Sequence, residues 1–236
     1  MPVRRRSLQH SASSLDKAFD PLIHSFNWLA NLKSKALPMS PKVGIAPKRR
    51  AEIIEATFFC IALKGYSNIT MQDIADSAGV SKGVIHYYFH NKEELFLSVF
   101  DKLIKDLDTH LGRKVQRAKT PPEKIRAIIT AVFEKVRENK KFQVVLLDFW
   151  AHSTKIPKLQ DATANQYARY RHLAKKIISE GVDKGYFIEC DPARIASALI
   201  GLVEGLMIQW IFDQNAFDLS RAQKMTDEII MGYLQR

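Results

Sequence analysis

The sequence predicts an all-α protein. Apolar residues recur every three to four positions through most of the chain after residue 47, and short breaks with Gly, Pro or a capping residue separate these segments. No stretch alternates apolar and polar residues as a half-buried strand does. About nine helices are expected after residue 47. A chain of 236 residues is long enough to bury one core, or one core and a small second domain.

The first predicted helices are short and closely spaced. Residues 48–64 carry apolar side chains at the helical period and stop before a glycine. The next helix opens with Thr70 and Asp73 in a capping-box pattern and closes at Gly79. Ser81 is placed to cap a third helix, so three helices follow one another with tight turns between them.

Longer helices are expected in the rest of the chain, each with a recognisable start. These starts are Asn91 with Glu94, Thr120-Pro121 with Glu123, the run from Lys141, Pro157, Asp191-Pro192, and Ser220 with Gln223. The helix from Pro157 is expected to end near Lys184, where Gly185 follows.

Positive charge is concentrated near the N-terminus. The formal net charge is +11, and residues 1–50 contribute +8 of it, with ten Lys or Arg against Asp16 and Asp20. A basic chain favours a polyanionic partner such as nucleic acid or an acidic membrane surface. The remaining residues are only mildly basic, so the total charge alone does not identify the partner.

Residues 1–47 form an N-terminal extension that contains Ser and Pro and few acids. Within it, the stretch from Asp20 to Leu37 fits one amphipathic helix with Pro21 at its first position. A flexible or loosely docked tail and a specific surface-binding arm both stay open. So does a translation start at Met39.

No motif indicates an enzyme, and no metal or cofactor is expected. The chain has no paired cysteines, glycine-rich phosphate loop or nucleophile elbow, and Asp148 and His152 form an ordinary i,i+4 pair. Cys60 and Cys190 lie among apolar neighbours, which predicts buried free thiols in a reducing compartment. No apolar segment follows the N-terminal arginines as in a secretory signal, so a cytoplasmic protein is expected.

Residues 70–89 have the layout of a helix-turn-helix, in which the second helix enters the major groove of DNA. On a helical wheel, Lys82, Gly83, His86, Tyr87 and His90 share one arc, and Val84, Ile85, Tyr88 and Phe89 lie on the opposite arc. Residues 77–92 contain no acidic side chain, whereas a solvated face usually mixes both signs. The first arc therefore suits a groove-facing surface. The alternative is a helical hairpin whose rings fill a core.

The stretch ITMQDIADSAGVSKGVIHYYFHNKEELFLSVF resembles the DNA-binding domain of the TetR family of transcriptional regulators. That family's signature has the form T-x-x-x-I-A-x-x-A-G-V-S-x-G-x-x-Y-x-Y-F-x-x-K-E-x-L. His86 stands where the family usually has Tyr, and Val84 stands where Thr or another small residue is common. Both positions read the operator in this family, so the operator sequence stays open.

The resemblance implies a helix-turn-helix reader in residues 48–92 and an effector-binding and dimerisation domain in residues 93–236. By the same resemblance, Thr70 and Lys92 contact phosphates. The implied base-edge and backbone readers are Lys82, Gly83, Val84, His86 and Tyr87. Val84 is assigned by the resemblance alone, because the wheel places it on the core-facing arc.

The stretch YFIECDPARIASALIGLVEGLMIQW is similar to the BetI-like branch of the same family. Its apolar run is long enough to suggest a membrane helix, but Glu204 and Gln209 interrupt it, so no membrane association is expected. The small residues in it suit close packing against a twofold mate. We expect a homodimer through helices 191–213 and 220–235, with its recognition helices about 34–36 Å apart.

The expected function is a ligand-responsive regulator, and the resemblance implies a repressor that a small-molecule effector releases. The effector is expected among the central helices, where it tilts the helix that starts at Asn91. The candidate pocket residues are Phe100, Leu103, Phe133, Phe149, Trp150, His152, Tyr167, Tyr170 and Trp210. So many rings indicate an apolar or cation-accepting pocket. The alternative is a helical protein that sequesters a small molecule and binds DNA with little specificity.

His86 generates a prediction, because an imidazole can change its charge near neutrality and a tyrosine hydroxyl does not. His86→Tyr should change either the preference among operator variants or the dependence of binding on pH. The measurement is operator affinity from pH 6 to 8 on a panel of fragments. If affinity is unchanged across the panel and the pH range, His86 has no reading role.

Overall fold

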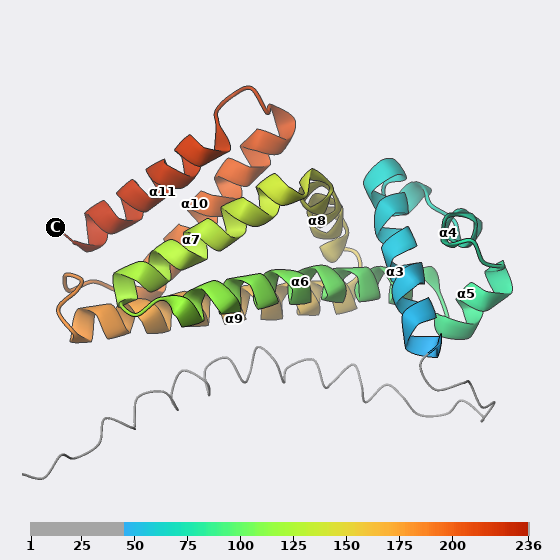
Figure 1. The fold of residues 1–236 in the computed structure, drawn as a ribbon, viewed down its shortest axis with the longest axis horizontal. Helices are drawn as coiled ribbons and strands as arrows, with labels where there is room; N and C mark the ends of the chain where they lie inside the picture. Colours follow the sequence, from blue (N-terminus) through green and yellow to red (C-terminus); the bar gives the residue numbers. More distant parts are fainter. Residues whose placement is uncertain (1–44, 236) are drawn as a thin grey trace, which may run out of the picture. The chain divides into compact units, whose positions relative to one another are not determined.

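The computed structural model describes residues 45–235, and the regular structure over this range consists of nine α-helices and one short 3-10 helix (Figure 1). The helices are α3 (Ile45–Lys64), η1 (Tyr66–Asn68), α4 (Met71–Ala78), α5 (Lys82–Tyr88), α6 (Lys92–Arg117), α7 (Pro121–Glu138), α8 (Lys140–Ser153), α9 (Pro157–Asp183), α10 (Pro192–Phe212) and α11 (Leu219–Leu234). The predicted all-α class is confirmed. The helix predicted from Asp20 and the start considered at Met39 lie outside the described residues.

Helices α3, α4 and α5 pack on one another as a three-helix reader. At the start of α4, Thr70 and Asp73 form the predicted capping box, and Gly79 ends the helix in the left-handed conformation at φ 63°. Ser81 caps α5 through a hydrogen bond from the Val84 amide. A small core of fully buried side chains joins the three helices, made by Ile53, Ile74, Ile85 and Phe89.

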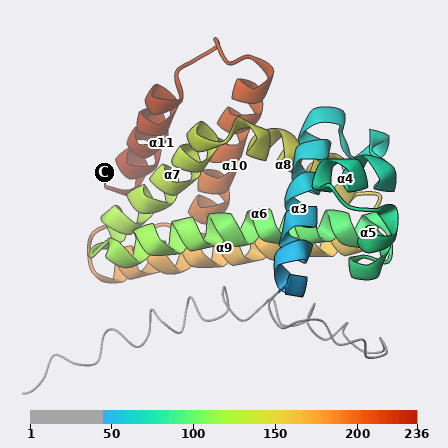
Figure 2. The ribbon, with the colours of Figure 1, turned by 45° about the vertical axis from the view of Figure 1, so that its right-hand side comes forward.

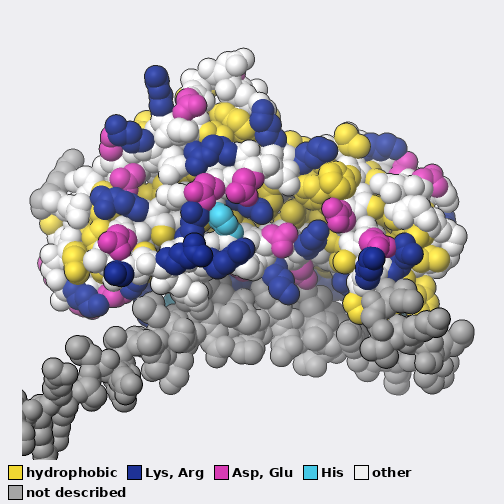
Figure 3. Space-filling model, in the orientation of Figure 1, with side chains coloured by type: hydrophobic (Ala, Val, Ile, Leu, Met, Phe, Trp, Pro, Cys, Tyr) yellow, Lys and Arg dark blue, Asp and Glu magenta, His cyan; other side chains and the backbone are white. Residues whose placement is uncertain are grey.

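Helices α6 to α11 form the body that follows the reader (Figures 1 and 2). The longest two, α6 and α9, lie side by side, and α7 packs on both of them. Helix α10 packs on α9, and α11 packs on α7 and α10. Helix α8 contacts α3 of the reader as well as α9 of the body, so it lies between the two parts. On the face shown in Figure 3, Lys and Arg side chains are interspersed with Asp and Glu, as expected for a mildly basic body.

Two sequence expectations need correction. Asp218, and not Ser220, caps the last helix: its carboxylate accepts hydrogen bonds from the backbone amides of Ser220 and Arg221 at 2.8 and 3.0 Å. Asp218 is the better N-cap than Ser220 because its carboxylate satisfies two backbone amides. It also places a negative charge at the positive end of the helix dipole. Cys60 is a buried free thiol as predicted, but Cys190 is only partly buried, since it lies in the exposed connection before α10.

Helix α10 is long and apolar enough to cross a membrane by length and composition, and it is the one helix within residues 45–235 that meets this criterion. The same criterion is met by core helices of soluble proteins. One face of α10 is buried through Val203, Leu206, Met207 and Trp210, and the helix packs on α7, α8, α9 and α11. Packing inside the body buries 33% of its most apolar stretch, and Ala198 and Gly201 are among the residues that stay exposed.

The end of α9 is shaped by a close contact between Gly181 and Phe187. The chain reverses at Gly185, which has φ 71°, and the amides of Tyr186 and Phe187 both donate to the carbonyl oxygen of Gly181 at 2.8 and 3.1 Å. Phe187 is then buried against the α carbon of Gly181, where a Cβ would collide with its ring. A glycine inside a helix is unfavourable by itself, so this contact explains its use here.

Gly181→Ala should lower the free energy of unfolding by about 1–3 kcal/mol, because the added methyl group overpacks the site. Urea unfolding measures the change. In a Phe187→Ala background the ring is gone, so the same substitution should cost much less. An equal loss in both backgrounds would show that the contact is not the cause.

Candidate nucleic-acid interface and effector cavity

Helix α5 presents the side chains that the wheel assigned to the groove-facing arc. Lys82, Gly83, His86 and Tyr87 are exposed, and 64% of the Tyr87 surface is accessible. Val84 is only half-buried, at the border between the two arcs. Ile85 and Phe89 on the opposite arc are fully buried and Tyr88 is half-buried. The structure thus separates the rings of this helix into a core set and an accessible set, as the 3.6-residue period predicts.

Thr70 and Lys92, the two implied phosphate contacts, are both engaged in the described structure. The Thr70 hydroxyl donates to the Asp73 carboxylate at 2.7 Å, and the Lys64 ammonium binds the same carboxylate at 2.6 Å. These hydrogen bonds, the one from Lys64 first, hold the pKa of Asp73 well below its usual range. The Lys92 ammonium lies over the Tyr66 ring, 4.4 Å from its centroid. A DNA phosphate that binds Thr70 would have to replace the hydrogen bond from its hydroxyl to Asp73. A phosphate that binds Lys92 would share the ammonium group with the Tyr66 ring.

A ring stack joins the reader to the body. Tyr66, in the turn after α3, stacks on Phe96 of α6 with centroids 3.8 Å apart, and Phe96 stacks on Phe149 of α8 at 4.1 Å. Phe100 meets Phe149 edge-on at 5.0 Å. The turn that precedes α4 is therefore fixed by side chains from two helices of the body.

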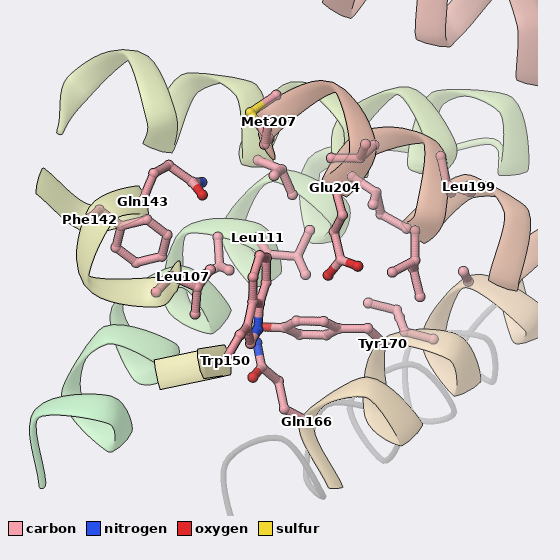
Figure 4. A pocket seen from close by; sticks show the side chains of 17 residues that line it. Leu107, Leu111, Phe142, Gln143, Trp150, Gln166, Tyr170, Leu199, Glu204 and Met207 are labelled. Atoms are coloured by element: carbon pink, nitrogen blue, oxygen red, sulfur yellow. The ribbon is translucent and has the colours of Figure 1, made fainter. Parts of the chain in front are cut away.

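A partly open cavity of about 90 Å³ lies between helices α6 to α10 of the body (Figure 4). One water molecule needs about 10–15 Å³ on this measure, so the space holds several waters or a compact organic molecule. Its lining is mostly apolar and consists of Leu107, Leu111, Ile128, Val132, Phe142, Gln143, Leu146, Trp150, Gln166, Tyr170, Leu173, Ala174, Leu199, Ile200, Val203, Glu204 and Met207.

Glu204 places a carboxylate in this apolar lining. It extends from α10 toward the ring of Tyr170, as Figure 4 shows. Burial raises the pKa of Glu204, and a hydrogen bond from the Tyr167 hydroxyl partly opposes that rise. The Tyr170 hydroxyl donates to Asp108 of α6 at 2.8 Å, so its ring is held in place. A partly desolvated carboxylate beside aromatic rings is a favourable setting for a cation.

Three buried polar atoms of the lining have no hydrogen-bond partner within residues 45–235. They are the Trp150 Nε1, the Gln143 Oε1 and the Gln166 Oε1. Gln143 and Gln166 are only 3% and 4% exposed. An unpartnered buried group costs about 1–3 kcal/mol, so three of them at one cavity indicate a place where water or a ligand supplies the missing partners.

Two family models match the chain. The model described as "Bacterial regulatory proteins, tetR family" matches residues 53–99, and the one described as "BetI-type transcriptional repressor, C-terminal" matches residues 121–235. The HTH-type transcriptional regulator BetI 1 of Chromohalobacter salexigens is 31% identical over 202 residues, which cover 83% of this chain and 95% of that protein. The BetI regulator of Pectobacterium carotovorum is 32% identical over 206 residues, which cover 83% and 99%.

The chain belongs to the TetR family of transcriptional regulators. Its C-terminal half is of the BetI type, and the family is not an enzymatic one.

Solved structures of transcriptional regulators share the fold. A putative transcriptional regulator from Saccharomonospora viridis, solved in complex with choline, superposes with a TM-score of 0.75 at 23% identity, covering 80% of this chain and 99% of that one. A TetR transcription regulator from Haloarcula marismortui superposes with a TM-score of 0.74 at 23% identity, covering 80% and 100%.

The nine predicted pocket residues divide into several environments. Trp150 and Tyr170 line the cavity, and Tyr167 reaches it through Glu204. The others lie elsewhere: Phe100, Leu103, Phe133 and Phe149 are buried core, His152 contacts Ser67 of the reader at 2.9 Å, and Trp210 carries the Lys140 ammonium 5.5 Å from its ring centroid. Rings were thus a poor guide to this cavity, because buried rings are ordinary core residues.

The polar side chains Gln143, Gln166 and Glu204 were not among the predicted pocket residues. Gln143 and Gln166 lie on the buried faces of α8 and α9, and the half-buried Glu204 interrupts the apolar run of α10. Buried polar groups in apolar surroundings are uncommon and usually have a partner, so this pattern was the available signal.

His86 of α5 and His90, two residues after the end of that helix, stand four residues apart, a spacing that some metal sites use. Over residues 45–235, however, no group of three or more His, Cys, Asp or Glu side chains is placed to hold a metal ion.

Proposed function

We propose that this TetR-family regulator is a repressor that binds a pseudo-palindromic operator through α5 and is released when a small organic cation occupies the cavity. The observation that carries the proposal is the cavity itself: a half-buried carboxylate, two aromatic rings and three unpartnered polar atoms converge in an otherwise apolar space. Such a combination favours a compact ligand that carries a positive charge and hydrogen-bonding groups.

The choline complex of the Saccharomonospora viridis regulator supports this class of effector. The likeness to that protein, at 23% identity, concerns the fold, so the argument for a cation in this chain rests on its own residues. Glu204 supplies the negative charge, the rings of Trp150 and Tyr170 supply faces for a cation, and the indole N–H of Trp150 is free to donate to a ligand oxygen. Choline is therefore the probe of choice.

The proposed regulator acts as a homodimer in the cytoplasm. Helix α11 exposes Met225, Ile229 and Tyr233 at a spacing of four residues, which places them on one face. On α10, Ala198 and Gly201 are exposed, and small residues allow close approach of a second helix. Pairing these two helices with their copies buries the stripe in a four-helix interface and presents two recognition helices to successive major grooves.

Footprinting on the DNA upstream of the protein's own coding region tests the proposal. A protected pseudo-palindrome that choline releases is the expected result. Retention that is weak, equal on all fragments and abolished by moderate salt would favour the sequestering alternative, because non-specific binding depends steeply on ionic strength.

Glu204→Gln should weaken choline binding by about tenfold to hundredfold, since a half-buried carboxylate that pairs with a cation is worth about 1.4 kcal/mol or more. The raised pKa of Glu204 fixes the direction of the pH dependence: the carboxylate loses its charge as pH falls, so wild-type affinity should fall on acidification. The Glu204→Gln variant should lack this dependence.

Isothermal titration over a pH series measures both effects. Glu138→Gln is the matched control, because Glu138 is an exposed carboxylate at the end of α7. Choline affinity that Glu204→Gln leaves unchanged would rule out the carboxylate as the cation partner.

A further inference from the structure

Helix α8 has two functional faces. Phe142, Gln143, Leu146 and Trp150 line the cavity. On another side of the helix, Lys141, Asp148, Phe149 and His152 contact α3, η1 or the ring stack. The spacing of each set is that of one helical stripe, so a single rigid helix meets the cavity and the reader.

Asp148 and His152 hold the turn between α3 and α4. The Tyr66 backbone amide donates to the Asp148 carboxylate at 2.6 Å. The Nδ1 of His152 lies 2.8 Å from the Asp148 carbonyl oxygen, which only accepts, so this nitrogen carries the proton. In the neutral ring the Nε2 then accepts from the Ser67 hydroxyl at 2.9 Å. The His152 ring also meets the Tyr66 ring edge-on at 5.0 Å.

Besides these contacts, the Tyr66 ring ties the turn to α6, because it stacks on Phe96 and lies under the Lys92 ammonium. None of the three residues of η1 is buried, whereas Ile69 next to it is 3% exposed and anchors the entry to α4. Thr70, which caps α4, follows two residues after η1. A displacement of the turn is therefore passed directly to the helix that braces the recognition helix.

We propose that Asp148 and His152 are the positioning residues that couple the effector cavity to the DNA reader. A ligand that displaces the cavity face of α8 shifts these two side chains, and with them the turn and the start of α4. The inference rests on the proposed function, and it assigns the coupling to α8 instead of to a tilt of α6 alone.

A competing route through α6 exists in the same structure. The Tyr170 hydroxyl, at the cavity, donates to Asp108 of α6, and α6 continues to the reader. Tyr170→Phe cuts this link and leaves the ring in place, whereas Asp148→Ala cuts the link through α8. The two routes are thus separable by single substitutions.

A cycle of substitutions tests the inference without any ligand. Leu146→Trp enlarges a side chain on the cavity face of α8 and stands in for an occupied cavity. Combined with Asp148→Ala, it gives four proteins: wild type, two single variants and the double variant. Hydrogen exchange of the backbone amides at residues 66–73 is measured in all four, together with affinity for the footprinted operator.

If α8 couples the cavity to the turn, Leu146→Trp should speed hydrogen exchange of the turn amides by about fivefold or more. It should weaken operator binding by a similar factor, which is in the usual range for coupled sites. In the Asp148→Ala background its further effect should fall below about twofold, because the link is already cut. Asp148→Asn keeps a side-chain oxygen for the Tyr66 amide and should restore part of the coupling.

Additive effects of Leu146→Trp and Asp148→Ala would overturn the proposal, as would a Leu146→Trp variant whose turn exchanges at the wild-type rate. An effect of Leu146→Trp that survives Asp148→Ala and disappears with Tyr170→Phe would assign the coupling to α6. The exchange measurement decides these outcomes even if choline does not bind or no operator is found, so failure of the proposed function stays distinguishable from failure of the coupling.

Discussion

The stack of Tyr66, Phe96 and Phe149 is the contact on which the arrangement of reader and body depends. Its rings come from the turn before α4, from α6 and from α8, with centroids 3.8 and 4.1 Å apart. Phe96 is 1% exposed and Phe149 is fully buried, so the stack combines large apolar burial with the added stabilisation of about 0.5–1.5 kcal/mol that paired rings provide. The reader is attached through this stack as well as through the continuous α6.

The lining of the cavity, unlike the ring stack, contains buried groups that destabilise the fold when they have no partner. Three buried polar atoms of the lining have no partner within residues 45–235, and each would cost about 1–3 kcal/mol if neither water nor a ligand reached it. The core of the reader, by contrast, is apolar, so the groups that the proposed effector would satisfy are gathered at the cavity. A ligand that satisfies them therefore stabilises the body while it occupies the cavity.

The helices and the two sides of α5 could be predicted from the sequence, whereas the lining of the cavity could not. Local rules decide the former: Thr70 and Asp73 form a capping box wherever this turn occurs, and the 3.6-residue period separates His86 from Ile85. The cavity depends on how five helices meet, so the choice of rings found Trp150 and Tyr170 but also selected Phe133, a core residue. The cap at Asp218 was missed because Ser220, two residues later, has an equally plausible sequence pattern.

The same distinction between rigid packing and weakly held turns favours α8 as the coupling element. One face of α6 is buried from Leu95 to Val115, so tilting the helix requires repacking against both α3 and α7. The turn η1 has no buried residue, and its position depends on a few contacts: the Tyr66 ring on Phe96, the Ser67 hydroxyl on His152, and the charge-assisted hydrogen bond from the Tyr66 amide to the Asp148 carboxylate. A hydrogen bond to a charged group is worth about 1.5–3 kcal/mol, and coupling between sites is typically about 1–3 kcal/mol. One such contact therefore has the magnitude that the proposed coupling needs, and the Tyr66 ring has to move against Phe96 when the turn shifts.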